Sequence, residues 1–309
     1  IGITVGMLWT AAYNHYYLNY ARKYDGKTIS TDVTVTDYSY ETDFGVAADG
    51  RVNIADRSFS VRLYYPVKTV LVPGDTISGK IRFRMTTDDS MQGGTYHQGN
   101  GIFLLGYADE KATITEATED SLEFFGSHLR RKMSDLIVDA FPTDTVGFAN
   151  ALLLGDSNLV DYETDTDFKL SGIRHIIAVS GLHVSILMAV VYILTARKRF
   201  LAPIIGIPVL LIFAAVVGFT PSVVRACIMQ GLVLLALFLN KDYDPPTALA
   251  FAVLTMLCVN PMTIVSVSFQ LSCGCIVGIF LFYEPITNYL LKNLRVPKGK
   301  NWRSRLIRW

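Results

Sequence analysis

A run of polar side chains able to do chemistry interrupts a strongly apolar part of the chain between Ser171 and Ser185. The run continues directly into the apolar segment from Ile186 to Leu194. An ionisable group at membrane depth costs roughly 2.5 kcal/mol or more, so such groups usually face a partner, a bundle interior or a water-filled path. This stretch therefore predicts a functional site inside a membrane protein. The residues concerned are Arg174, His175, Ser180, Gly181 and His183.

Two catalytic interpretations of these residues fail on chemical grounds. Ser180 and His183 stand at i and i+3, but a serine hydrolase also needs an oriented base and an oxyanion hole, and the spacing indicates neither. A zinc site fails because His175 and His183 have no third carboxylate or thiol at helical spacing. We therefore predict no catalytic residue, no metal and no cofactor. Lining of a polar path and hydrogen bonding between helices both remain open.

The element expected to position these groups is a helix over about 173–195. On such a helix, residues 175, 179 and 183 follow one slowly rotating face, so both imidazoles and Ser180 would share a lumen. Arg225, Gln270 and Ser272 on later apolar helices are further candidates for the same path, with helix-to-helix hydrogen bonding as the alternative.

Composition and charge support a membrane protein. The 309 residues are 51% hydrophobic with a mean hydropathy of +0.34, and the apolar residues concentrate after Gly172. The four cysteines all lie in this half and are interpreted as packing residues. Five spans are expected, at 173–195, 201–219, 222–240, 246–261 and 263–283. The basic loop 196–200 and the basic tail 292–309 belong in the cytoplasm, which places Gly172 outside.

The first half of the chain predicts three further parts. Residues 1–22 resemble the outer part of a first transmembrane helix, and the chain looks like a fragment because it begins without Met and ends in a basic run. Residues 119–172 form a helical connector, with an amphipathic helix over 121–141. Gly155 is expected to end a short apolar helix, and Asp156 to cap the next turn.

Residues 26–118 predict a small all-β domain. Alternating strands are expected at 31–37, 51–54, 58–64 and 76–84, with turns at 49–50 and 72–75, which suits an OB-like barrel. Arg62, Lys80, Arg82 and Arg84 are candidate DNA contacts, and Phe59, Tyr64 and Phe83 could stack on bases. Ordinary solvated strand faces remain the alternative, because residues 26–120 hold nine Lys and Arg against fourteen Asp and Glu.

The predicted fold class is therefore a polytopic α-helical membrane protein with an inserted, extracytoplasmic, OB-like β-barrel. The domains are the first helix at 1–22, the barrel at 26–118, the connector at 119–172, the transmembrane domain at 173–291 and the tail at 292–309.

The order of several short motifs resembles the ComEC family of bacterial DNA-internalisation proteins. The most specific block runs from Gly155 to Val184, and it follows the small β domain that begins near Tyr24. The later matching segments are Gly218-Phe-Thr-Pro-Ser-Val-Val-Arg-Ala226, Asn260-Pro261 and Ser268-Phe-Gln-Leu-Ser272.

The resemblance implies an inner-membrane channel component that carries single-stranded DNA into the cytoplasm during natural transformation. Its implied partners are the DNA strand, the lipid bilayer, a DNA receptor and a cytoplasmic motor. We expect no enzyme activity, because the His-x-His-x-Asp-His signature of the family's nuclease domain is missing from these residues. The alternative function is a secondary transporter of a small anion with an external β domain.

Overall fold

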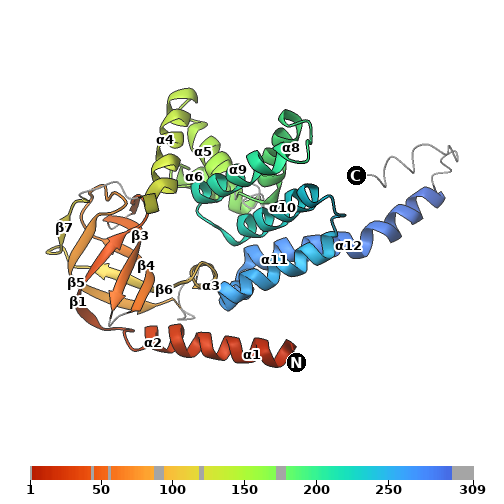
Figure 1. Ribbon diagram of the computed structural model, residues 1–309. Helices are drawn as coiled ribbons and strands as arrows, with labels where there is room; N and C mark the ends of the chain where they lie inside the picture. The colour runs from red at the N-terminus through yellow and green to blue at the C-terminus, as the bar shows by residue number, and fades with distance from the viewer. Residues whose placement is uncertain are drawn as a thin grey trace. The chain divides into compact units, whose positions relative to one another are not determined.

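The computed structural model describes residues 2–42, 45–54, 57–86, 94–117, 122–171 and 179–293 (Figure 1). The chain divides into two compact units, Ile1–Phe269 and Gln270–Trp309. The first unit holds a β-barrel and most of the helices, and the second begins within the last helix.

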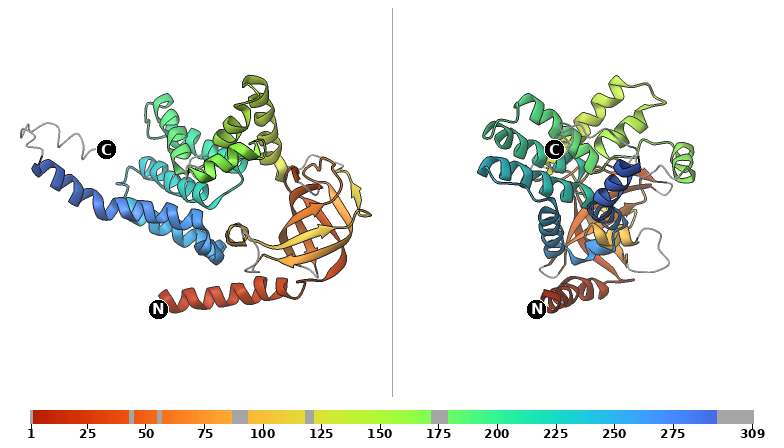
Figure 2. Two further views of the ribbon diagram at one scale, coloured as in Figure 1. Left: turned by 180° about the vertical axis from the view of Figure 1, so that it is seen from behind. Right: turned by 90° about the vertical axis from the view of Figure 1, so that its right-hand side faces the viewer.

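Five strands close into the barrel (Figures 1 and 2). Their order is β1-β3-β4-β6-β5, and β1 pairs with β5 to complete the ring. The β4–β6 pair is parallel, whereas the other neighbouring pairs are antiparallel. The strands are β1 (Thr28–Val35), β3 (Gly45–Ile54), β4 (Arg57–Tyr65), β5 (Thr76–Met85) and β6 (Ile102–Ala108). The short strands β2 (Tyr40–Thr42) and β7 (Thr113–Thr115) extend β3 and β5.

Alternation of apolar and polar residues explains the barrel core. Along β5, Ile81 and Phe83 are fully buried, while Lys80, Arg82 and Arg84 between and beside them are exposed. The four expected strands and the turn at 72–75 are confirmed, and Gly74 takes a φ of +99° there. Strand β6 was not predicted, because its near-continuous apolar run carries little alternation.

The expected turn at Asp49-Gly50 is wrong, because both residues lie inside β3. A Cβ on Gly50 would meet Val33 Cγ1 at 2.8 Å and the Thr34 carbonyl oxygen at 3.0 Å. Glycine therefore serves a close approach of β1 to β3 rather than a chain reversal.

The first helix packs against the barrel at its C-terminal end. It runs through α1 (Gly2–Tyr13), the π-helical turn η1 (Asn14–Leu18) and α2 (Asn19–Arg22). Tyr20 stacks on Phe59 of β4 at 5.8 Å between ring centroids, and Arg57 lies over both Tyr16 and Tyr20. The aromatic end of this helix thus packs on the barrel.

The connector contains three described helices after the 3-10 turn η2 (Leu122–Phe124): α4 (Phe125–Ala140), α5 (Val146–Leu154) and α6 (Tyr162–Leu170). Ile137 of α4 packs with Leu154 of α5 and with Val216, so the amphipathic helix packs on other helices. As predicted, Gly155 ends α5 with a φ of +75°. Asp156 then accepts a hydrogen bond from the Asn158 backbone N–H at 3.0 Å.

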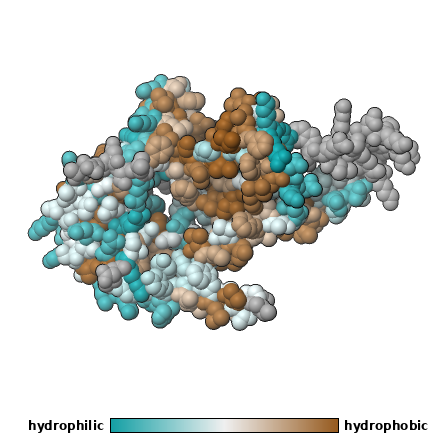
Figure 3. Space-filling view, viewed as in Figure 1, coloured by the Kyte–Doolittle hydropathy of each residue, from teal (hydrophilic) through white to brown (hydrophobic). Residues whose placement is uncertain are grey.

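The apolar helices follow, and hydrophobic surface gathers over α8, α9 and α10 (Figure 3). Among the described residues, Pro221–Leu239 and Val267–Leu290 are long and apolar enough to cross a membrane, and three apolar helices are shorter. The helices are α8 (Gly181–Leu194), α9 (Leu201–Val217), α10 (Pro221–Leu239), α11 (Pro245–Val259) and α12 (Val267–Asn293), with the 3-10 turn η3 (Pro261–Val265) before α12.

Candidate functional site

The polar stretch does not continue one helix, because α8 begins only at Gly181. Ser180 is the N-cap, with extended φ and ψ of −123° and 174°. Its hydroxyl accepts from the Leu182 N–H at 3.3 Å, and the Ser180 N–H donates to His183 Nδ1 at 3.1 Å. This reciprocal arrangement is a capping box. Ser180 and His183 therefore start the helix, which gives both side chains a structural role.

The expected helical face through 175, 179 and 183 is wrong, because Val179 and Ser180 are not helical. Arg174 and His175 lie outside the described residues. Gln270 and Ser272 belong to α12 in the second unit, Gln270 being exposed and Ser272 half-buried. Their path-lining role stays a prediction.

Arg225 is brought to the start of α8. A Cβ on Gly181 would lie 3.3 Å from Arg225 Nη2, so the missing side chain makes room for the guanidinium. Arg225 is only 6% exposed, and its Nη1 contacts the Met229 sulfur at 3.6 Å. The structure thus gathers Ser180, Gly181, His183 and Arg225 where α8 begins beside α10.

A larger cavity of about 650 Å³ lies where the barrel and the helices meet. Its barrel side includes Asp49 of β3 and Tyr96 of the short helix α3 (Gly94–Gly99). Its helical side includes Arg130, Gly155 and Asn260. Gly218, Phe219, Thr220 and Pro221, which join α9 to α10, line it as well. We call this cavity the junction pocket.

The α9–α10 turn forms one wall through its backbone geometry. Gly218 and Phe219 both adopt positive φ, of +89° and +54°, and Pro221 then starts α10. A proline at the first helical position fits because that N–H has no partner within the helix. The resulting sharp reversal places the turn against the pocket. The family resemblance includes this segment, but its residues alone do not indicate that it lines a pocket.

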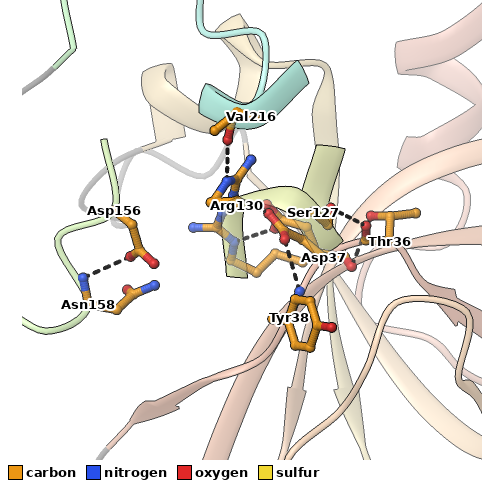
Figure 4. A network of polar contacts seen from close by, with 10 residues as sticks. Thr36, Asp37, Tyr38, Ser127, Arg130, Asp156, Asn158 and Val216 are labelled. Carbon is orange, nitrogen blue, oxygen red and sulfur yellow. Dashed lines mark hydrogen bonds and ion pairs between the residues drawn. The ribbon is translucent and has the colours of Figure 1, made fainter. Parts of the chain in front are cut away.

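Arg130 joins three parts of the first unit at the pocket (Figure 4). From α4, its Nη1 donates to Asp37 Oδ2 at 2.5 Å in the loop after β1. Its Nε donates to the carbonyl oxygen of Val216 near the end of α9. Ser127 Oγ also donates to the Thr36 carbonyl oxygen at 3.2 Å. The connector helix is therefore fastened to the barrel, and Arg130 extends that joint to α9.

Asn260 makes a second joint on the other side of the pocket. Its Nδ2 donates to the carbonyl oxygens of Gln98 and Gly99 at 3.1 and 3.3 Å, and its Oδ1 accepts from the Met262 N–H. A Cβ on Gly99 would come within 2.6 Å of Ser266 Cβ, so the contact tolerates only glycine. The barrel loop that carries α3 is thus fixed to the end of α11.

The charged groups on the barrel side are already paired. Arg62 donates to both carboxylate oxygens of Asp49, at 2.7 and 2.9 Å. Burial lowers the pKa of Arg62, but the hydrogen bond to Asp49 and its negative charge outweigh this and raise the pKa overall. Burial also lowers the pKa of nearby His97, and the Arg62 charge lowers it further. Arg62 is therefore committed to Asp49, which the sequence did not indicate.

The remaining barrel candidates share an outer face with two tyrosines. In register across the sheet, Tyr64 pairs with Tyr107, and Tyr107 pairs with Arg82. The two rings stack with centroids 5.2 Å apart. Lys80, Arg82 and Arg84 project from the same exposed side of β5. Phe59 and Phe83 are 3% and 0% exposed, so their expected stacking role is wrong. Tyr107 was not among the candidates, because strand β6, which carries it, was not predicted.

Within the described residues, no group of three or more His, Cys, Asp and Glu side chains is arranged to hold a metal ion. The cysteines are free thiols at Cys227, Cys258, Cys273 and Cys275.

The match to a known protein family falls in the helical half of the chain. Residues 152–307 match the protein family described as Competence protein. The chain is also 31% identical over 147 residues to ComE operon protein 3 of Bacillus subtilis (strain 168), covering 47% of this chain and 19% of that protein. It is 29% identical over 168 residues to Recombination protein 2 of Haemophilus influenzae (strain ATCC 51907 / DSM 11121 / KW20 / Rd), covering 50% and 21%. The matched stretches span about a fifth of these curated relatives. No solved structure matches.

The fold defines a class of protein in which a small β-barrel is joined to a set of apolar helices at a polar pocket. The family match covers half of the chain, so the chain belongs to the competence protein family. The resemblance drawn from the sequence motifs is thereby confirmed. Gly155, the α9–α10 turn and Asn260, which line the pocket, all fall within the matched residues.

Proposed function

We propose that this chain is part of a multi-pass membrane channel that carries a single DNA strand into the cytoplasm, and that the strand enters through the junction pocket. The observation that carries the proposal is the composition of the pocket wall. The barrel contributes Asp49 and Tyr96, and the helices contribute motif segments of the competence family. A strand that passes from an external domain to a helical bundle has to cross this junction.

The size and polarity of the pocket suit this role. Its volume of about 650 Å³ falls within the roughly 300–1,000 Å³ of pockets that hold small organic ligands, and a nucleotide is a ligand of that kind. Arg130 offers guanidinium hydrogen-bond donors for a phosphate, while Val224 and Ile228 offer apolar surface for a base. Both parts of a nucleotide thus find complementary groups.

The membrane location rests on the helices. Lys198 lies in the basic loop after α8, and this loop and the basic tail belong on the cytoplasmic side by the positive-inside rule. The barrel then lies outside the membrane. Of the helices, α10 and α12 have the length of ordinary spans, whereas α8, α9 and α11 are shorter than the roughly 20 residues of an ordinary span.

The barrel supplies a surface on which bases could stack. Its strand order, with β4 parallel to β6, is the one we assign to an OB-like barrel, a fold whose strand face binds oligonucleotides. The Tyr64–Tyr107 stack next to Arg82 combines aromatic and cationic groups, as sequence-tolerant strand binding requires. Burial raises the pKa of Tyr64, which further favours the neutral phenol.

Beyond the pocket, Arg225 with Ser180, Gly181 and His183 would form the next polar stage of the path. Direction and energy would come from other uptake proteins, including a receptor and a cytoplasmic motor. The proposal assigns passage of DNA to this chain and no chemical step.

Crosslinking during uptake tests the proposal. A variant without the four native cysteines receives one cysteine at Thr220 or Thr255 in the pocket wall, or at exposed Asp139 on α4 as the matched control. We expect a strand carrying a thiol-reactive group to crosslink at Thr220 and Thr255, and not at Asp139. Uptake without any crosslink at the two pocket positions would contradict the proposal. Saturable flux of a small anion without DNA crosslinking would favour a transporter instead.

A further inference from the structure

Among the described residues, Arg130 is the cation that lines the junction pocket, and its Nη2 has no hydrogen-bond partner within that part of the chain. Nε donates to the Val216 carbonyl oxygen and Nη1 to the Asp37 carboxylate. The remaining nitrogen, Nη2, lies toward Gly218 in the pocket wall. A guanidinium presents five N–H donors in a fixed fork, so two fixed contacts leave donors for an oxyanion.

Gly218 keeps that edge of the guanidinium open. A Cβ at this position would lie 2.9 Å from Arg130 Nη2. The positive φ of +89° also disfavours any other residue there. The turn therefore combines two requirements, a sharp chain reversal and an uncovered arginine.

The nearby negative charge in the pocket wall does not compete for Arg130. Asp49 and Arg130 are the charged residues among the described residues that line the pocket. Asp49 is held by two hydrogen bonds from Arg62, which neutralises it. Asp37, outside the wall, is thus the carboxylate that shares the Arg130 guanidinium.

We propose that Arg130 binds a phosphate of the DNA strand in the junction pocket, and that Asp37 competes with this phosphate for the same guanidinium. The proposal rests on the proposed function, because it assumes that the strand occupies the pocket. Arg130 is then both the phosphate contact at the mouth of the path and the residue that joins barrel, connector and α9. Binding of the strand weakens the Arg130–Asp37 contact and so loosens that joint.

The first test measures the salt dependence of strand binding. The purified full chain in nanodiscs of zwitterionic lipid is titrated with a fluorescent oligothymidylate at several salt concentrations. Each phosphate contact to a single strand contributes about 0.7 to the slope of log K against log salt. Arg130→Gln should lower that slope by about 0.7 and weaken binding about tenfold at low salt. An unchanged slope would overturn the proposal.

Asp37→Asn provides a second variant with the opposite expected effect. Asparagine keeps a carbonyl oxygen for the hydrogen bond but removes the competing negative charge. Affinity for the oligothymidylate should rise about threefold or more, because a phosphate no longer competes with a carboxylate. The gain should vanish in the Arg130→Gln background, since coupled residues are non-additive. A gain that persists in the double variant would overturn the proposal.

Two controls separate a binding role from a merely structural one. Arg131→Gln removes the same charge from the next position of α4, where Arg131 pairs with Asp135 at 56% and 60% exposure. It should leave affinity and slope unchanged. Gly218→Ala covers the Arg130 edge while keeping every charge, and it should weaken binding like Arg130→Gln. Full affinity in a folded Gly218→Ala protein would overturn the proposal.

The outcomes also distinguish this inference from the proposed function. Crosslinking at Thr220 with no effect of Arg130→Gln on binding would reject the phosphate contact and leave the path intact. Absence of crosslinking at Thr220 and Thr255 would reject the path itself. Inorganic phosphate is the second probe: competition with the oligothymidylate in the wild type, and not in Arg130→Gln, supports an oxyanion site at this residue. Phosphate binding to a chain that ignores the oligothymidylate would overturn its assignment to DNA.

Discussion

The barrel and the apolar helices distribute polar and apolar groups in opposite ways. The barrel buries Phe83, Ile81 and Leu63 and exposes the charged residues of β5. The helices expose large apolar side chains, with Ile193, Leu211 and Leu254 at 77%, 63% and 61%. They also bury polar ones, including Arg225 at 6% and Asn150 at 0%. The two regions therefore suit different solvents.

The two regions draw their stability from different sources. In water, an exposed apolar surface of this extent marks an interaction site, because soluble monomers keep such patches small. In lipid the same surface costs nothing, and buried polar groups then hold helices together. The opposite arrangement within one chain fits the proposal of a barrel in water and helices in a bilayer.

The largest predicted effect tests this contrast directly. Phe83→Ala should lower the stability of the barrel by about 3–5 kcal/mol, because it leaves a cavity in a closed core. Leu211→Ala, at a site 63% exposed on α9, should cost less than about 0.5 kcal/mol if its surroundings are lipid. Hydrogen exchange of the purified chain in nanodiscs measures both changes locally. Equal costs at the two sites would show that Leu211 packs against protein, and the contrast would fail.

A second prediction concerns a polar group buried in the helical part. Asn150 of α5 is 0% exposed, and its amide oxygen and nitrogen have no hydrogen-bond partner in the described part of the chain. Asn150→Leu should raise the free energy of unfolding by about 1–2 kcal/mol, because it removes an uncompensated polar group of similar volume. Asn158→Leu, in the loop after α5, is the control and should give no gain. A loss of stability in Asn150→Leu would mean that the amide has a polar partner.

Much of the barrel could be predicted because strand alternation is a local signal. The spacing of Ile77, Ile81 and Phe83 identifies β5 without any tertiary information. Gly50 misled the prediction, since a glycine required by strand crossing has the same one-letter signature as a turn glycine. Strand β6 was lost for a related reason, because burial on both faces removes the alternation.

The candidate site could be predicted far less well, because it depends on contacts between distant segments. Arg130 falls within the predicted amphipathic helix over 121–141, and only the fold shows its bonds to Asp37 and Val216. Ser180 and His183 drew attention as chemistry in an apolar span, although the local pattern also fits a capping box. The sequence thus identified these residues as polar, but it did not predict the contacts that they make.

A third prediction concerns Ser180 as the N-cap of α8. Ser180→Ala should destabilise the helical part by about 1 kcal/mol, because it removes the side-chain acceptor of the N-cap. Ser180→Asp should retain most of the stability, since aspartate caps helices as well as serine does. Thermal unfolding of the purified chain measures both. DNA uptake that survives in Ser180→Asp excludes a nucleophilic role for the hydroxyl.

The smallest predicted effect concerns pH and the barrel side of the junction. Burial and the Arg62 charge lower the pKa of His97, so the unfolded chain binds a proton more readily than the folded one. Above the ordinary histidine pKa of about 6.5, the ring is neutral in both the folded and the unfolded chain and does not affect the free energy of unfolding. Stability is lost as pH falls below that value. His97→Gln should flatten the dependence of barrel stability on pH between about 7 and 5. Hydrogen exchange of barrel peptides at matched pH values detects this change, with exposed His15→Gln as the control. An unchanged pH profile in His97→Gln would mean that the ring protonates freely in the folded barrel, and that the Asp49–Arg62 pair beside it does not control its charge.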